Sequence, residues 1–153
     1  MSKNNIQKIH IGYLKFGYFF ASVTAFLAGA AIYAFFRNTN NMIMFQFFSK
    51  PLFLNSLYIS IKTNTVWSYM FIFNLPYGLW CFSGLLFIRA IWINNIKWRQ
   101  IYGGIFIAIV MSYVILKLLK ITPGTFDVLD LLFMGFFAFL ESIIFNMFIR
   151  RYL

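Results

Sequence analysis

The sequence predicts an all-α polytopic integral membrane protein with four transmembrane helices. Of its 153 residues, 62% are hydrophobic, 23% are aromatic and only 10% are charged, and the mean hydropathy is +0.80. A chain of this length cannot bury so much apolar surface in a core of its own. Lipid must therefore surround most of it, which argues against a soluble enzyme, a disordered tail or a disulfide-stabilised domain.

The chain is strongly basic, with 13 Lys and Arg against 3 Asp and Glu. These cations lie at the ends of apolar runs, where they anchor helices to lipid headgroups, and they form no free basic face. We therefore expect a lipid bilayer as the environment and no nucleic-acid partner. Cys81 is the only cysteine and His10 the only histidine, so we predict no disulfide, metal centre or cofactor.

Two uncharged runs in the first half predict the first two spans, at about residues 16–36 and 66–88. At about 1.5 Å per residue, each can cross a hydrocarbon core of about 30 Å. Pro76 lies inside the second run, where its missing N–H predicts a kink or a break in the helix. Small residues recur in the first run and would let a second helix approach closely; these are Ala21, Ala25, Ala28 and Gly29.

Two further runs predict the third and fourth spans, at about residues 101–117 and 128–149. The third is short, and we expect Lys117 to reach out to the interface and lengthen it. Residues 40–62 alternate short apolar runs with polar side chains. We expect this segment to form interfacial or re-entrant helices, with an additional span as the alternative.

The distribution of Lys and Arg predicts the orientation. With four spans, the N-terminal segment, the 89–100 loop and the tail share one side and hold eight of these residues. The 37–65 segment and the 117–127 loop hold the other five. The more positive side stays in the cytoplasm, so we expect cytoplasmic N- and C-termini.

All three acidic residues belong to the last span or its start: Asp127, Asp130 and Glu141. Asp130 and Glu141 lie 11 positions apart, which returns to within about 20° of the same helix face, and Asp127 lies near that face. Asp127 and Asp130 suit the capping of a helix N-terminus, or alternatively a site for a headgroup or cation. Glu141 should face the bundle interior and have a partner, either as a hydrogen-bonded packing residue or as a functional group.

Asn74 precedes Pro76 and Gly78 in the second span, and this combination can mark a broken helix that lines a cavity. A simple proline kink is the alternative. The partners expected for Glu141 are the backbone freed by Pro76 and three side chains: Asn74, Ser83 and Asn146. If a polar cavity exists, Asn74 and the acids should converge on it. The candidate ligand-binding residues are Asn74, Asp127, Asp130 and Glu141, and we assign no catalytic or metal-binding residue.

Two segments resemble VanZ-like proteins, which are small bacterial membrane proteins. They are T-P-G-T-F-D-V-L-D-L-L-F over 122–133 and N-L-P-Y-G-L-W over 74–80, and the matching motif positions are Gly124, Asp127 and Asp130. The chain departs from the pattern at Phe133 and Met134, where the family usually has an asparagine, and at Tyr77, where an acid is expected. VanZ-like proteins are implicated in resistance to the glycopeptide teicoplanin. The resemblance thus implies a cell-envelope protein of the bacterial inner membrane.

Three hypotheses of function follow from these features. The first is a non-enzymatic protein that binds an amphiphile, a lipid-linked molecule or a partner subunit in an intramembrane polar site, with homo-oligomers possible. The second is an acid/base enzyme acting on a lipid headgroup, and the third is a small transporter or channel subunit that uses Glu141. The sequence contains no nucleophile–base pair and no metal-ligand set, which favours the first hypothesis.

Overall fold

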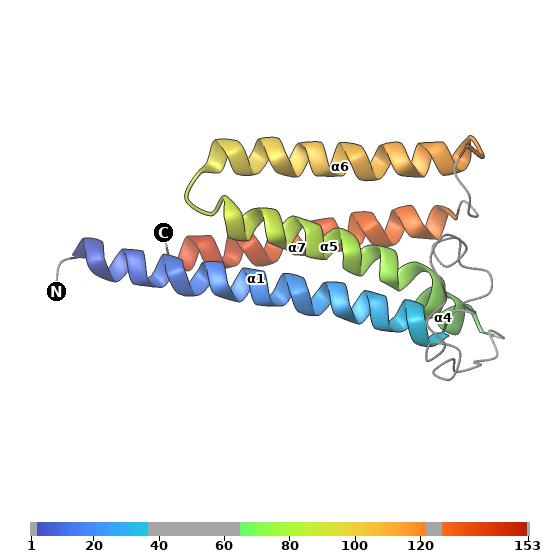
Figure 1. Ribbon diagram of the computed structural model, residues 1–153, viewed down its shortest axis with the longest axis horizontal. Helices are drawn as coiled ribbons and strands as arrows, with labels where there is room; N and C mark the ends of the chain where they lie inside the picture. Colours follow the sequence, from blue (N-terminus) through green and yellow to red (C-terminus); the bar gives the residue numbers. More distant parts are fainter. Residues whose placement is uncertain (1–2, 37–64, 122–126, 153) are drawn as a thin grey trace, which may run out of the picture.

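The computed structural model describes residues 3–36, 65–121 and 127–152, and within these ranges every regular element is a helix (Figure 1). The elements are α1 (Lys3–Phe36), α4 (Val66–Tyr69), the π-helix η2 (Met70–Asn74), α5 (Leu75–Ile91), α6 (Ile96–Leu118) and α7 (Val128–Tyr152). Segment 40–62 and Gly124 lie outside the described residues.

Within the described residues, four helical segments are long and apolar enough to cross a membrane. They are Ile11–Phe36, Val66–Ile91, Ile96–Leu118 and Val128–Met147. The chain is therefore an all-α multi-pass membrane protein, as predicted. Few side chains are buried in three of these spans, as expected where lipid is the solvent, whereas Val66–Ile91 is the most buried of the four.

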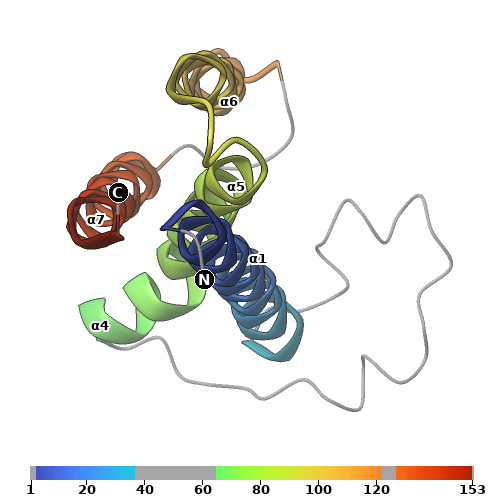
Figure 2. The same ribbon diagram turned by 90° about the vertical axis from the view of Figure 1, so that its left-hand side faces the viewer.

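The second span occupies the centre of the bundle. Figure 2 shows α1, α6 and α7 around α5, and α5 packs against each of them. Figure 1 shows the start of α1, the end of α7 and the α5–α6 turn at the same end of the molecule. This arrangement is the one expected for an even number of spans.

Three glycines let the helices approach one another closely. A Cβ atom on Gly29 of α1 would lie 2.7 Å from Trp80 Nε1 of α5. On α5, a Cβ on Gly78 would lie 2.4 Å from the Phe137 ring of α7, and one on Gly84 would lie 2.3 Å from the Phe106 ring of α6. The expectation that small residues mediate packing thus holds for Gly29 and Ala25, which are buried, whereas Ala21 and Ala28 are exposed.

Pro76 does not break the second span. Met70–Asn74 form a π-helical turn, and the Leu75 N–H donates to the Met70 carbonyl five residues back. Pro76 then falls in the first turn of α5, where a missing N–H costs little. Of the two outcomes expected at Pro76, a kink and a break, the structure has the kink: the helix continues through the π turn and bends there, so that α4 leaves the line of α5 (Figure 2).

The third span begins five residues earlier than the predicted 101–117. Asn95 is its N-cap and accepts a hydrogen bond from the Trp98 N–H through Oδ1 at 3.2 Å, and α6 starts at Ile96. The prediction was wrong because it treated Lys97 and Arg99 as loop residues, whereas the turn between α5 and α6 is very short. As a result, Arg99 belongs to the first two turns of a membrane-spanning helix.

Candidate functional site

The four candidate residues form two polar clusters and not one. Asn74, Asp127 and Asp130 lie together, whereas Glu141 contacts Arg89. Asp130 and Glu141 both face the second span, so the prediction that they share one helix face agrees with the structure. Their convergence on one cavity is wrong, since 11 residues of helix separate them by about 16 Å.

The first group, here called the Asn74 cluster, joins η2 to the start of α7. Asn74 is fully buried, and its Nδ2 donates to Asp130 Oδ1 at 2.9 Å and to Asp127 Oδ2 at 3.2 Å. Tyr69 Oη also donates to Asp127 Oδ2, at 3.0 Å. One amide side chain therefore holds two carboxylates, which explains why a polar residue is buried in this span.

Asp127 caps α7, as its position before the last span predicted. Its Oδ1 accepts a hydrogen bond from the Leu129 N–H at 2.9 Å. Burial alone would raise the pKa of the Asp127 carboxyl. The hydrogen bonds from the Leu129 backbone, Asn74 and Tyr69 outweigh that effect and hold this pKa below its ordinary value.

Lys117 completes the Asn74 cluster. Its Nζ lies 3.9 Å from Asp130 Oδ2 and donates to Tyr77 Oη at 3.1 Å, and the side chain is buried. The expectation that Lys117 reaches out to the interface is therefore wrong. The carboxylate and the phenol inside the bundle replace water as partners of the ammonium group.

Replacing Asn74 by alanine is expected to lower the free energy of unfolding by about 1–3 kcal/mol, since the buried carboxylate of Asp130 and the partly buried one of Asp127 then lose a shared donor. The matched control is Asn146→Ala, because Asn146 is an exposed asparagine in another span. Unfolding by dodecyl sulfate in mixed micelles, followed by circular dichroism, measures both variants. Equal losses in the two would show that the Asn74 cluster does not contribute to stability.

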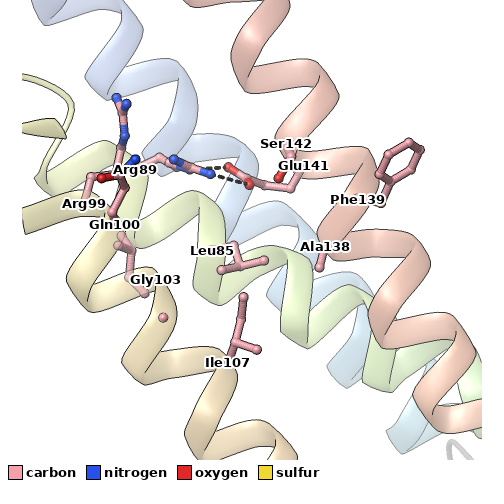
Figure 3. A pocket seen from close by; sticks show the side chains of 12 residues that line it. Leu85, Arg89, Arg99, Gln100, Gly103, Ile107, Ala138, Phe139, Glu141 and Ser142 are labelled. Carbon is pink, nitrogen blue, oxygen red and sulfur yellow. Dashed lines mark hydrogen bonds and ion pairs between the residues drawn. The ribbon is translucent and has the colours of Figure 1, made fainter. Parts of the chain in front are cut away.

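The second group, here called the Arg89 cluster, lies at the end of the bundle that carries the α5–α6 turn. Arg89 Nε donates to Glu141 Oε1 at 2.9 Å, and Arg89 Nη2 donates to Glu141 Oε2 at 3.2 Å (Figure 3). Glu141 has no exposed surface. The partners predicted for Glu141 were wrong, because Arg89 was assigned to the interface as a helix anchor. Its guanidinium instead turns inward and meets both carboxylate oxygens.

Arg99 is the second cation of the Arg89 cluster. Only 8% of its surface is exposed, and its Nε and Nη1 atoms are buried without a hydrogen-bond partner among the described residues. The guanidinium carbons of Arg99 and Arg89 lie 4.3 Å and 4.2 Å from the centre of the Phe145 ring. The ring supplies a cation–π contact to both, but it cannot accept conventional hydrogen bonds from them.

A groove of about 390 Å³ opens beside the Arg89 cluster, between α6 and α7, with α5 as its floor. Arg89, Arg99, Gln100, Glu141 and Ser142 supply its polar lining. The apolar lining consists of Leu85, Ile88, Gly103, Gly104, Ile107, Ala138 and Phe139 (Figure 3). A Cβ atom on Gly103 or Gly104 would meet open space, so both glycines leave the groove wide.

No protein-family model, curated protein or solved structure matches this chain. The function must therefore be inferred from the residues of the site. The groove contains one of the four candidates, Glu141, together with residues that the sequence did not single out. Arg99 and Gln100 were assigned to a loop, and the signal for them was the Asn95 cap, which predicts a helix start ahead of these side chains.

Proposed function

We propose that this protein is a non-enzymatic membrane protein that binds an amphiphile or a lipid-linked molecule in the groove between α6 and α7. The observation that carries the proposal is the groove itself, which joins a charged end to an apolar stretch inside the span region. A cavity needs a volume of about 10–15 Å³ to hold one water molecule, so a groove of 390 Å³ offers far more room than a few bridging waters require.

The two parts of the groove match the two parts of an amphiphile. Arg99 and Gln100 offer hydrogen-bond donors at one end, and Ile107, Ala138 and Phe139 line the remainder with apolar surface. Phe139 and Ile107 are exposed, so an acyl chain can enter from the surrounding bilayer without crossing the protein. Ligand sites in proteins commonly combine mostly apolar walls with a few polar groups that fix orientation.

We propose further that the protein resides in the inner membrane of a bacterium, with both termini in the cytoplasm. The excess of Lys and Arg on the side of the termini and the α5–α6 turn supports this orientation. The bacterial envelope assignment rests on the resemblance to VanZ-like proteins at Asp127, Asp130 and residues 74–80. In this orientation the groove's polar end faces the cytoplasmic leaflet.

The acid/base and transport hypotheses have less support from the geometry. Both oxygens of Glu141 accept hydrogen bonds from Arg89, so the carboxylate already has a cation as its partner. Asp127 and Asp130 are engaged by Asn74 and lie outside the groove. No carboxylate is left to approach a bound headgroup as a general acid or base.

Replacing Gly103 by leucine tests the proposal, because the new side chain would occupy open space in the groove. The full chain is extracted from a bilayer of phosphatidylcholine and phosphatidylglycerol, and lipid retention is read by native mass spectrometry. We expect the unmodified protein to retain a lipid that Gly103→Leu loses. A loss of only about 1.4 kcal/mol in the binding free energy would already lower the lipid affinity about tenfold.

The matched control is Gly17→Leu, since Gly17 also lies in a span and also has open space around its Cβ, but on α1 and away from the groove. Gly17→Leu should retain lipid like the unmodified protein. Identical retention in Gly103→Leu would contradict the proposal. A dimer that Gly103→Leu dissociates would also contradict it, because the occupant of the groove would then be a second copy of the chain.

A further inference from the structure

Resting on the proposed function, the geometry points to a more specific ligand. We propose that the polar end of the groove binds the phosphate group of an anionic phospholipid, with Arg99 as its main contact. The proposal concerns the headgroup only, so it can fail while an amphiphile still occupies the apolar part of the groove.

The first argument is the balance of charge. The whole sequence has only three acidic side chains. Asp127 and Asp130 belong to the Asn74 cluster, and Arg89 takes both oxygens of Glu141. The Arg89 cluster is thus left with one positive charge in excess. No carboxylate of the described residues is hydrogen-bonded to Arg99, although a buried guanidinium requires an anion nearby.

The second argument is the unmet hydrogen-bonding capacity of Arg99. Two of its nitrogens, Nε and Nη1, are buried with no partner in the described part of the chain, and the residue also lines the groove through its remaining atoms. Buried donors in proteins almost always have an acceptor. A phosphate offers several strong acceptor oxygens to a guanidinium, and Gln100 and Ser142 line the same end of the groove and can add donors.

The third argument is depth in the membrane, which favours a lipid phosphate over free phosphate. Beside the Arg89 cluster, the Trp92 ring stacks on Tyr102 with centroids 5.2 Å apart, and Trp98 lies 5.8 Å from Tyr102. Tryptophan and tyrosine gather at the level of the headgroups. From that level the groove continues along α6 past Gly103 and Gly104 to Ile107, where an acyl chain would lie.

The experiment compares two lipids with the same acyl chains on the full-length protein. These are dioleoyl phosphatidylglycerol and dioleoylglycerol, which lacks the phosphate, and binding is titrated by native mass spectrometry in a neutral detergent. We expect phosphatidylglycerol to bind at least tenfold more tightly, since hydrogen bonds to a charged group are the strong ones. Equal affinity would overturn the phosphate assignment, and binding of dioleoylglycerol would show that the proposed function survives.

Arg99→Gln should remove that preference and leave dioleoylglycerol binding unchanged. Lys97→Gln is the matched control, because it removes one positive charge from an exposed residue on the same helical turn. We expect its phosphatidylglycerol affinity to stay within about twofold of the unmodified protein, as for exposed charges in general. Equal losses in both variants would overturn the proposal in favour of general attraction to a basic surface.

Inorganic phosphate forms the last arm and separates the two sources of the anion. At 10 mM it should leave phosphatidylglycerol bound, because the acyl chains add apolar contact that free phosphate lacks. Complete displacement at this concentration would overturn the lipid assignment. If Arg99→Gln fails to fold, the comparison of the two lipids on the unmodified chain still decides the proposal.

Discussion

Replacing Glu141 by leucine is expected to lower the free energy of unfolding by about 3–5 kcal/mol, the largest effect of a single substitution that we predict. Glu141 has no exposed surface and accepts two hydrogen bonds from Arg89. Without it, the guanidinium groups of Arg89 and Arg99 would both remain against the Phe145 ring with no carboxylate in the Arg89 cluster. The loss is measured in mixed micelles, with Asn146→Leu as the control at an exposed polar position of α7.

A double-mutant cycle isolates the ion pair from the packing around it. Arg89→Leu should also destabilise the protein, because it leaves the carboxylate of Glu141 buried and unpaired. The double variant Glu141→Leu/Arg89→Leu should lose clearly less than the two single losses combined, since it leaves no unpaired member of this pair. Strictly additive losses would show that the two residues are not coupled in the folded protein.

One bound of each of three spans could be predicted, because hydropathy reports directly on what a lipid bilayer tolerates. The first span ends at Phe36, the second starts at Val66 and the fourth starts at Val128, in each case where the uncharged run predicted. The start of α6 could not be predicted in this way. A helix that begins at a cap can carry Lys97 and Arg99 in its first turns. The last charged residue before the apolar run therefore does not mark where this helix starts.

The pairs within the site depend on helix rotation and register, which a single sequence does not contain. Glu141 and Arg89 lie 52 positions apart on different helices. Arg89 near a helix end could equally well extend toward the headgroups or turn inward. The sequence did indicate that Glu141 has a partner, because the general rule is that a carboxylate inside a span needs one. Applied to cations as well, the same rule would have drawn attention to Arg89, to Lys117 and, once α6 was extended, to Arg99.

The π turn before Pro76 shows a different limit of prediction. The proline indicated that the regular hydrogen bonding of the helix must change nearby, and this was correct. It could not indicate whether the chain would break or would shift to bonds between residues five apart. The outcome places Asn74 against Asp127 and Asp130, so the local backbone geometry decides which side chains form the Asn74 cluster.

Replacing Gly78 by leucine is the second large effect that we expect, with a loss of about 3 kcal/mol in the free energy of unfolding. Even a Cβ atom there would lie 2.4 Å from the Phe137 ring and 3.3 Å from the Phe133 carbonyl oxygen, so α5 and α7 must move apart. Gly78 lies between Asn74 and Arg89 in the chain, and both of those residues reach α7. Separation of the helices would therefore lengthen the polar contacts on either side of it.

Gly135→Leu is the matched control, because Gly135 lies within the α7 span and a Cβ atom there meets nothing within 4 Å. It should be neutral or slightly stabilising, since glycine is a poor helix former. The buried thiol of Cys81 provides a second measurement, as it packs with Met134 of α7 in one apolar cluster. Its labelling by a maleimide should accelerate in Gly78→Leu and not in Gly135→Leu. Unchanged labelling in Gly78→Leu would mean that the interface between α5 and α7 adapts by rotating the Phe137 ring alone.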